Sequence, residues 1–320
     1  MSRYGELRLI SCQSATNFAA LVAKELETSL VKTQVVTFSN QNVQPEIMEN
    51  ISGSDAYIFM QHSDNLGNAI LEMLAMIDAA KYASNANRVT IVVPYFPYAR
   101  SDKKEGRRIS EMAGLIKAFM REAGADRVLT MDPHSNTIEV AHKNLQVDAL
   151  TATRILAEHI VGEEKDGFVF VAPDVGAAKY VKKHTKGMGI PWAILNKDRK
   201  DDTETAEMGD EIMGNVRDKK AFIFDDEALS GSTLIEGVDV LLRNGAIEVS
   251  AATTHGFLTK NGPDLIQDSP LQKLYITDTI PLPSQKERGK IEVVSVVQLF
   301  AQAIKVRHND ESFHAMRDRH

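Results

Sequence analysis

Acidic residues followed closely by small hydroxyl residues form the most chemically suggestive group in this sequence. The segment AFIFDDEALSGST, at 221–233, runs from four apolar residues into a polar group that contains Asp225, Asp226, Ser230, Gly231, Ser232 and Thr233. This order predicts a buried strand, a tight loop directly after it and the start of a helix. The N–H groups of a helix start can bind phosphate, and the carboxylates can accept hydrogen bonds from sugar hydroxyls or hold a metal ion through its waters. We therefore expect an anionic or hydroxylated ligand at this junction.

A purely structural role is the alternative for this group. Acids and hydroxyls cap many helices by accepting hydrogen bonds from the first backbone N–H groups. Capping explains one such residue well, whereas this segment places three acids beside three hydroxyls. The sequence contains no GxxxxGK[ST] loop, so a P-loop nucleotide kinase is disfavoured.

A run of cations is the second suggestive group. The segment PYFPYARSDKKEGRRIS follows an apolar run and carries Arg100, Lys103, Lys104, Arg107 and Arg108. Positive charges gathered at a strand end suit a polyphosphate ligand. The alternative is a loop whose charges only face solvent, which is the usual meaning of a charge run.

Histidine and acidic residues follow two further apolar runs. His134 lies in MDPHSN and Asp174 lies in APDVGAAK, and both residue types bind divalent ions or their waters. A single histidine is more often a hydrogen-bonded structural residue, so both interpretations stay open at these positions. We interpret His255 and His314 as structural or interfacial.

The segment LNKDRKDDTETAEM, at 195–208, follows another predicted strand. As a mobile lid it would bring Lys197 and Arg199 over transferring phosphates, where neutralising charge lowers the barrier to transfer. As an exposed loop it would have no such role, and the segment by itself favours this second interpretation.

Short β-rich runs alternate with helical stretches over most of the chain. Strands are predicted at 56–61, 88–96, 127–132, 167–174, 191–195, 221–226, 248–256 and 273–278. Amphipathic helices are predicted at 109–125 and 232–246. This alternation predicts an α/β fold with mainly parallel sheets flanked by helices, in which ligands bind at the carboxyl ends of the strands.

Two segments of the chain echo each other. From Gly124 and from Gly245, the chain continues with alanine, has valine four residues later and histidine ten residues later. Either a shared glycine helix cap or two related α/β halves explains the echo. We expect two domains, 1–150 and 151–320, because 320 residues suffice for two cores.

The composition argues against several classes of protein. The net charge of −7 argues against a protein that coats nucleic acid, and a single cysteine, Cys12, allows no internal disulfide. No apolar run approaches the roughly 20 residues that span a bilayer. We expect a cytoplasmic protein with neither a signal peptide nor a membrane anchor.

Taken together, the motifs resemble those of the ribose-phosphate pyrophosphokinases, also called phosphoribosyl pyrophosphate synthetases. The order and spacing of that family are met by VVPYFPYARSDKK, GADRVLTMDPHS, APDVGAAK, FDDEALSGST, TTHGFLT, ITDTIPLP and LFAQAIKVRHNDES. The resemblance implies two phosphoribosyltransferase-like domains, with about 295–310 returning to the first, in a homo-oligomer that is commonly a hexamer. It also implies transfer of the diphosphoryl group of Mg-ATP to the anomeric hydroxyl of ribose 5-phosphate, giving phosphoribosyl pyrophosphate and AMP.

The resemblance implies a role for each matching residue. Asp225 and Asp226 would bind the ribose hydroxyls, and the loop from Ser230 to Thr233 would hold the 5-phosphate. Lys197 and Arg199 would stabilise the transferring group.

The resemblance implies that other residues bind the nucleotide and its metal ion. ATP binding is implied for Phe38, Asn40, Asn42, Arg100, Ser101 and Asp102. Phe38 would pack on adenine from a neighbouring subunit. His134 and Asp174 would serve Mg²⁺ and the phosphates.

This chain departs from the family pattern at several positions, and Gly231 in the phosphate loop stands one place from the usual glycine. Asn40 and Asn42 replace carboxylates near the adenine pocket, and Ser101 replaces a glutamine. Leu229 replaces a carboxylate in the phosphate loop, and Asp198 replaces a basic residue between the two lid cations. The departures bear on the choice of nucleotide and of acceptor.

Four functions therefore compete. The first is an active diphosphokinase on ribose 5-phosphate, and the second is the same chemistry on a larger 5-substituted ribose such as ADP-ribose. A non-catalytic regulatory paralogue is the third. A phosphoribosyltransferase that consumes the activated sugar is the fourth, and two concatenated halves fit it poorly.

Overall fold

The computed structural model describes residues 3–40, 42–101, 108–135, 137–139, 145–162, 166–195, 212–283 and 289–317. Three expected site residues, Asp102, Lys197 and Arg199, lie outside this described part. The chain divides into two compact units. Unit 1 comprises Met1–Leu150, Thr279–Pro281 and Val296–His320, and unit 2 comprises Thr151–Asp278 and Leu282–Ser295. Strands and helices alternate in both units, so the expected α/β class is confirmed.

Unit 1 is built on a parallel sheet. Among its described residues the sheet has five strands in the order β1-β4-β5-β6-β7. These are β1 (Leu7–Ser11), β4 (Asp55–Phe59), β5 (Arg88–Val92), β6 (Arg127–Met131) and β7 (Gln146–Leu150). Every residue of β4 and β5 is buried, as expected for parallel strands that are covered on both faces.

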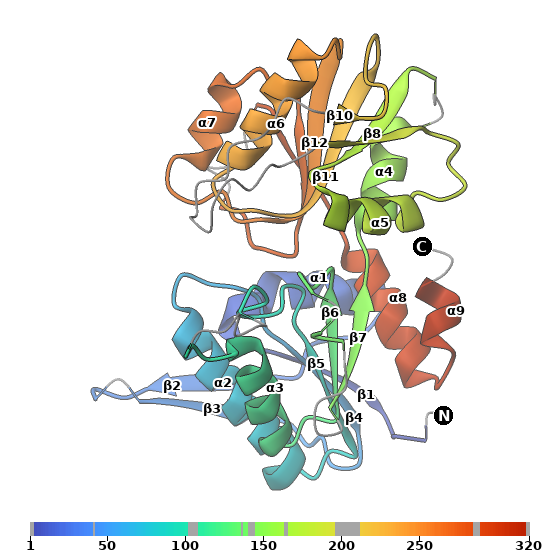
Figure 1. Cartoon of the computed structure of the whole chain (residues 1–320). Coiled ribbons are helices and arrows are strands. Elements are labelled where there is room, and N and C mark those ends of the chain that lie inside the picture. The colour runs from blue at the N-terminus through green and yellow to red at the C-terminus, as the bar shows by residue number, and fades with distance from the viewer. Residues whose placement is uncertain are drawn as a thin grey trace. The chain divides into compact units, whose positions relative to one another are not determined.

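Helices and one hairpin surround this sheet (Figure 1). The α-helices are α1 (Thr16–Glu25), α2 (Leu66–Asp78), α3 (Met112–Glu122), α8 (Val297–His308) and α9 (Phe313–Arg317). A 3-10 turn, η1 (Gln13–Ala15), precedes α1, and a π-helical turn, η2 (Ala79–Ala83), ends α2. Strands β2 (Thr33–Thr37) and β3 (Val43–Ile47) pair antiparallel with each other in a separate hairpin. No described helix is long and apolar enough to cross a membrane.

Unit 2 contains a wider sheet. In the described residues its seven strands follow the order β10-β9-β8-β11-β12-β13-β14, and β10 runs antiparallel to β9 at one edge. The strands are β8 (Phe168–Ala172), β9 (Trp192–Leu195), β10 (Ile212–Met213), β11 (Lys220–Ala228), β12 (Glu248–Gly256), β13 (Leu274–Thr277) and β14 (Ile291–Val294). The helices are α4 (Thr153–Val161), α5 (Val175–His184), α6 (Ser232–Arg243) and α7 (Gly262–Asp268).

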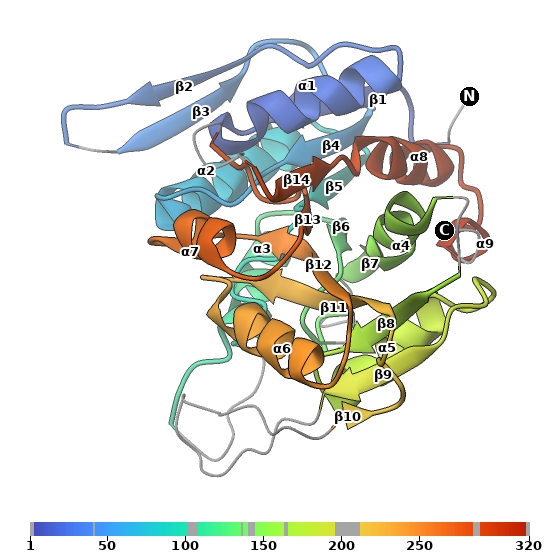
Figure 2. The ribbon, with the colours of Figure 1, turned by 90° about the horizontal axis from the view of Figure 1, so that it is seen from above.

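Two helical layers cover the unit 2 sheet. Figure 2 shows α6 and α7 on one side of the strands and α4 and α5 on the other. Leu234, Val238 and Leu241 of α6 pack with Ala221 and Ile223 of β11 in one apolar core. On the opposite face phenylalanine rings of β8 and β11 contact each other, one pair edge to face with centroids 5.0 Å apart. The period of two along β11 therefore divides its residues between two buried layers.

The glycine echo of the sequence has a local explanation. Gly124 follows α3 with φ +110° and Gly245 follows α6 with φ +92°, a backbone region that favours glycine. The next N–H in each case donates to a carbonyl five residues earlier, from Ala125 to Met120 and from Ala246 to Leu241. This is the Schellman pattern of helix ends. A shared cap therefore accounts for the repeated Gly-Ala without a relation between the two halves.

Buried ion pairs attach α8 to the unit 1 sheet. Asp55, fully buried at the start of β4, accepts hydrogen bonds from Nε and Nη2 of Arg88 at 2.7 and 2.6 Å. The same carboxylate lies 2.8 Å from Nδ1 of His308 at the end of α8. Arg307 forms a two-point ion pair with Asp148 of β7. These pairs fix the last helical turn of α8 on the amino-terminal edge of the sheet.

Removing the Asp55 charge should destabilise unit 1. In Asp55→Asn the buried Arg88 guanidinium loses its counter-charge, which typically costs about 3–5 kcal/mol. Urea denaturation followed by circular dichroism measures the loss. Asp78→Asn, at an exposed position of α2, should change the free energy of unfolding by less than about 0.5 kcal/mol. Equal stability of the two variants would contradict the importance of the Asp55 network.

Candidate functional site

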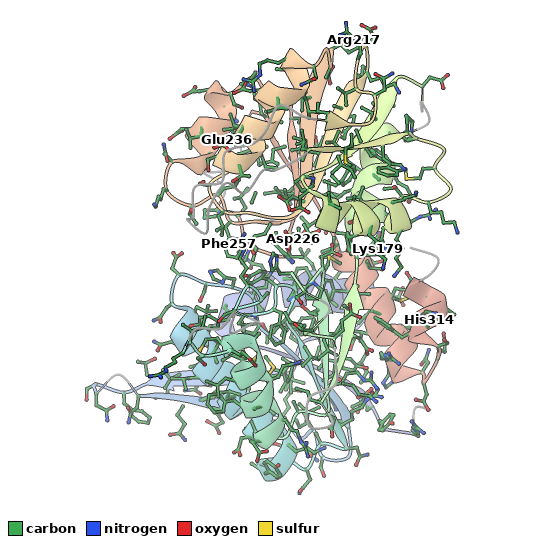
Figure 3. The ribbon with its side chains drawn as sticks, in the orientation of Figure 1. Lys179, Arg217, Asp226, Glu236, Phe257 and His314 are labelled. Carbon is green, nitrogen blue, oxygen red and sulfur yellow. The ribbon has the colours of Figure 1, made fainter. Side chains whose placement is uncertain are left out.

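The acidic pair of unit 2 lies within strand β11. The sequence predicts a loop directly after residue 226, and this prediction is wrong because β11 stays paired with β12 through Ala228. Asp225 and Asp226 are half-buried, and Oδ1 of Asp225 accepts a hydrogen bond from the Asp226 N–H at 2.9 Å. Figure 3 shows Asp226 at the carboxyl end of the sheet and Arg217 at the opposite end.

Strand geometry sends the two carboxylates to different faces of the sheet. Alternate residues of a strand point to opposite sides, so Asp225 shares its face with Ile223 and Asp226 shares its face with Phe224. Asp225 also lies in register with Thr253 on β12. The pair thus presents one carboxylate on the α6 side and one on the other side, at the edge where open parallel sheets bind ligands.

The turn that follows is tight and braced from behind. The Ala228 carbonyl accepts from the N–H of Phe257 at 2.9 Å, and the Leu229 carbonyl accepts from the N–H of Thr259 at 2.7 Å. Gly231 precedes α6 with φ +84°, which a residue with a side chain adopts only with strain. The side chain of Leu229 is 42% exposed. These hydrogen bonds hold the strand-to-helix turn from its inner side. Its outer surface, which includes Leu229, stays exposed.

Hydroxyl groups and a helix N-terminus lie together at this turn. The Ser230 and Ser232 hydroxyl oxygens are 3.0 Å apart, and the Ser232 N–H points to Ser230 Oγ at 3.4 Å. Ser232 and Thr233 are exposed in the first turn of α6. Backbone N–H groups of a first helical turn and adjacent hydroxyls can bind an anion such as phosphate. The structure thus brings the six predicted residues of this group into one strand end and turn.

A segment that sequence reasoning missed supports the turn. Gly262 begins α7, and a Cβ atom added there would lie 2.9 Å from the Ser230 carbonyl oxygen. Leu258 and Lys260 just before it have positive φ angles of 46° and 56°. Pro263 after the glycine signals a helix start, but the sequence contains no sign that this start touches residue 230.

Asp174 lies at the same sheet edge as the acidic pair. It follows β8, the parallel neighbour of β11, and its Oδ1 accepts a hydrogen bond from the Ala177 N–H at 2.8 Å. The residue is therefore the N-cap of α5, and it remains half-buried. Capping uses one of the two carboxylate oxygens.

Unit 1 gathers polar residues at the carboxyl ends of β5 and β6. Asp132 follows β6, is 4% exposed and has φ +35°, and its N–H donates to the Leu150 carbonyl at 3.0 Å. Tyr98, after β5, has φ +58°. Strained residues of this kind persist where the surrounding structure fixes them, commonly at functional sites. His134 lies exposed two residues beyond Asp132.

The structure describes both ends of the cationic segment, with Arg100 and Ser101 before 102–107 and the exposed Arg108 after it. Arg100 is exposed, whereas Ser101 is half-buried and hydrogen-bonded. Its Oγ donates to the Ser110 carbonyl at 3.1 Å and lies 3.4 Å from the Met112 N–H. Ser101 therefore joins the chain on both sides of 102–107. The aromatic residues of this segment differ in burial: Tyr95 and Phe96 are buried, whereas Tyr98 is 38% exposed.

The predicted adenine residues lie on the hairpin. Phe38 follows β2 and is 46% exposed, and its N–H donates to the Asn42 carbonyl at 2.9 Å. The Asn42 N–H donates to Oδ1 of Asn40 at 3.2 Å. These contacts shape the hairpin tip, which Figure 1 shows extending from the sheet of unit 1. The described residues contain no group of three or more His, Cys, Asp or Glu side chains that would hold a metal ion.

Fold and site together define a two-unit α/β protein whose parallel sheets carry polar, partly strained carboxyl edges. Comparison with known families specifies this class further. Residues 7–124 match the N-terminal domain of ribose phosphate pyrophosphokinase, and residues 169–317 match the phosphoribosyl synthetase-associated domain.

Comparison with individual proteins indicates the same family. A ribose-phosphate pyrophosphokinase of Caldanaerobacter subterraneus subsp. tengcongensis is 36% identical over 98% of this chain and 98% of its own. That of Maricaulis maris is 35% identical over 96% of this chain and 98% of its own. The crystal structure of phosphoribosylpyrophosphate synthetase from Mycobacterium smegmatis matches with a TM-score of 0.87 and 29% identity, covering 95% of this chain and 99% of that chain. The chain belongs to the ribose-phosphate pyrophosphokinase family, which confirms the resemblance seen in its motifs.

The brace behind the turn at 229–231 gives a direct test of this site. In Gly262→Ala the new methyl group must displace the Ser230 carbonyl, and such overpacking typically costs about 1–3 kcal/mol. We expect lower stability of unit 2 in thermal denaturation and weaker binding of ribose 5-phosphate in calorimetry. Gly67→Ala in α2, where the added carbon has open space, should leave both unchanged or raise stability slightly. Ribose 5-phosphate affinity that is equal in both variants would contradict the role of the brace.

Proposed function

We propose that this protein transfers the β,γ-diphosphoryl group of Mg-ATP to O1 of ribose 5-phosphate, giving phosphoribosyl pyrophosphate and AMP. The observation that carries the proposal is the junction of β11 and α6, where two carboxylates, clustered hydroxyls and a helix N-terminus meet in one braced turn. Membership of the ribose-phosphate pyrophosphokinase family supports it independently.

Ribose 5-phosphate is the proposed ligand of unit 2. Its 5-phosphate fits the exposed first turn of α6, where Ser232, Thr233 and the helix dipole favour an anion. Asp225 and Asp226 are acceptors for the ribose hydroxyls. A carboxylate repels an anion. These two side chains therefore suit the uncharged hydroxyls of the ribose and not its 5-phosphate.

ATP is the proposed ligand of unit 1. Arg100 offers an exposed cation after β5, and His134 lies exposed after the neighbouring strand β6. Ser101, Asp102, Asn40 and Asn42 are proposed to complete nucleotide binding.

Mg²⁺ fits this chain as an ion carried by the nucleotide. Mg²⁺ commonly keeps several waters and binds through substrate phosphates with one or two protein groups. An exposed His134 and a half-buried Asp174 suit that mode better than a closed protein cage. When bound, the ion would neutralise charge on the phosphate chain.

The proposed reaction needs no protein nucleophile. The O1 oxygen forms a bond to the β-phosphorus, the bond from that phosphorus to the α,β-bridging oxygen breaks, and the hydroxyl proton passes to solvent as AMP leaves. Phosphoryl-type transfer depends on positioning and on charge stabilisation. We assign the second task to Lys197 and Arg199.

Organisation of the protein forms part of the proposal. Units 1 and 2 are proposed as the nucleotide and acceptor domains of a cytoplasmic homo-oligomer, such as a hexamer. Phe38, exposed on a hairpin whose two strands pair only with each other among the described residues, is proposed to reach the adenine of a neighbouring subunit. No role with nucleic acid or membranes is proposed.

A larger acceptor is the second candidate function. Leu229 exposes 42% of its surface beside the proposed phosphate site, at a position where the family has a carboxylate. An apolar side chain there removes charge repulsion toward a substituent on the 5-phosphate. An acceptor of the ADP-ribose type has such a substituent.

Release of AMP tests the proposed reaction. We expect the purified chain to form AMP and phosphoribosyl pyrophosphate in equal amounts from Mg-ATP and ribose 5-phosphate, and EDTA to abolish both. Asp226→Asn should lower kcat/KM for ribose 5-phosphate about 10- to 100-fold, because a hydrogen bond to a charged group contributes about 1.5–3 kcal/mol. Asp239→Asn, exposed on α6, is the matched control and should have no effect.

The other functions give different results in the same assay. Faster turnover with ADP-ribose than with ribose 5-phosphate would establish the larger acceptor. No AMP from either acceptor would contradict the proposal and favour a regulatory role. Lys197→Ala should abolish AMP formation, and activity that survives this change would contradict the role assigned to Lys197.

A further inference from the structure

A buried lysine lies in unit 1 near the segment that carries His134. Lys117 belongs to α3 and is 5% exposed, in line with Ala113, Ile116 and Met120 on the buried face of that helix. Burial lowers the pKa of its ammonium group. Moving an ammonium out of water is unfavourable unless hydrogen bonds replace its hydration. The partners of Nζ therefore decide what this lysine does.

Two of those partners are backbone carbonyls of the turn after His134. Nζ of Lys117 donates to the Ile138 carbonyl at 3.1 Å and lies 3.4 Å from the Thr137 carbonyl. The Ile138 N–H donates to the Ser135 carbonyl at 3.1 Å, and the Thr137 N–H donates to Ser135 Oγ at 3.2 Å. The Ile138 side chain is 1% exposed. The chain on the far side of His134 is thus anchored by apolar burial and by the ammonium together.

The near side of His134 is anchored as well. Asp132 is buried, adopts φ +35° and donates its N–H to the Leu150 carbonyl of the neighbouring strand at 3.0 Å. His134 lies between this fixed point and the turn bound by Lys117, and it is exposed. The backbone that carries this exposed residue is therefore held on both sides.

Stability alone is a weak reason for a lysine at this position. An apolar side chain of similar length would pack beside Ile116 and Met120 without the cost of desolvating a charge. We propose that Lys117 is a positioning residue of the proposed nucleotide site in unit 1. Its buried ammonium fixes the Thr137 and Ile138 carbonyls and thereby holds His134 against the phosphates of the bound nucleotide. The inference rests on the proposed function, because nucleotide binding at His134 is part of that function.

Nucleotide affinity is the first measurement. Lys117→Met keeps the length of the side chain and removes its donors, and Lys24→Met makes the same change at an exposed position of α1. Isothermal titration calorimetry with Mg²⁺ and α,β-methylene-ATP, whose α–β link cannot be cleaved, gives the Kd. We expect about 10-fold weaker binding for Lys117→Met, in the range known for residues that orient a binding group, and none of this loss for Lys24→Met. Binding of ribose 5-phosphate, which we assign to unit 2, should not change.

A double-mutant cycle separates positioning from a general structural effect. In a His134→Ala background, Lys117→Met should change the Kd by less than about twofold, because the group that it positions is already gone. A 10-fold loss in both backgrounds would overturn the proposal, and so would an unchanged Kd in Lys117→Met.

Hydrogen exchange tests the anchoring without any ligand. Peptides that cover 132–139 should exchange their amides faster in Lys117→Met than in the wild-type chain, while Lys24→Met leaves them unchanged. Equal exchange in all three proteins would overturn the proposal even if the enzyme were active. Failure of the wild-type chain to bind α,β-methylene-ATP would instead refute nucleotide binding, and the exchange rates would still decide whether Lys117 fixes this turn.

Discussion

Parallel pairing of strands is the constraint on which the candidate site of each unit depends. In unit 2, β8, β11 and β12 run in register in one direction, so the residues that follow each strand reach the same edge. Asp174 and Asp226 come from different parts of the sequence and lie at that edge for this reason. In unit 1 the same constraint brings the ends of β5 and β6 together with Arg100 and His134. Buried apolar residues on both faces enforce the register, because a shift by one residue would move each strand's side chains into the opposite packed layer.

Backbone geometry contributes to these edges together with charged side chains. Positive φ angles occur at Tyr98 and Asp132 beside one edge and at Gly231, Leu258 and Lys260 beside the other. Such conformations are unfavourable by themselves, and the hydrogen bonds around them, such as that from Thr259 to the Leu229 carbonyl, maintain them. A site built this way keeps its shape before a ligand arrives, which reduces the free-energy cost of ordering on binding.

Much of the fold could be predicted from local patterns, and the failures have physical causes. The β-rich run at 248–256 gave the bounds of β12, and the acid and hydroxyl motif lies at the carboxyl edge of the unit 2 sheet. The strand predicted at 88–96 ends at Val92, because Pro94 and Pro97 lack the N–H that a sheet needs. Strands β1 and β7 were missed because polar residues such as Arg8 and Asp148 interrupt their apolar pattern, and these residues form ion pairs on folding.

Tertiary contacts explain what no local pattern reveals about the site. Gly262 and Lys117 look ordinary in the sequence, and each matters only because a distant segment lies against it. The hydrophobic period of α3 even argues against a charged residue at 117, since that position faces the core. Position 117 has a role because residues 137–138, which are separated from it in the sequence by a strand, lie near it in the folded chain.

The route of the chain also determines the order in which the protein can be completed during synthesis. Unit 2 has its last residue at 295, whereas unit 1 needs α8, which ends at His308. Until that helix leaves the ribosome, Phe18 lacks the ring of Phe300 and Asp55 lacks His308. Unit 1, whose synthesis begins first, is therefore completed last. Its incomplete form exposes apolar surface while unit 2 is translated.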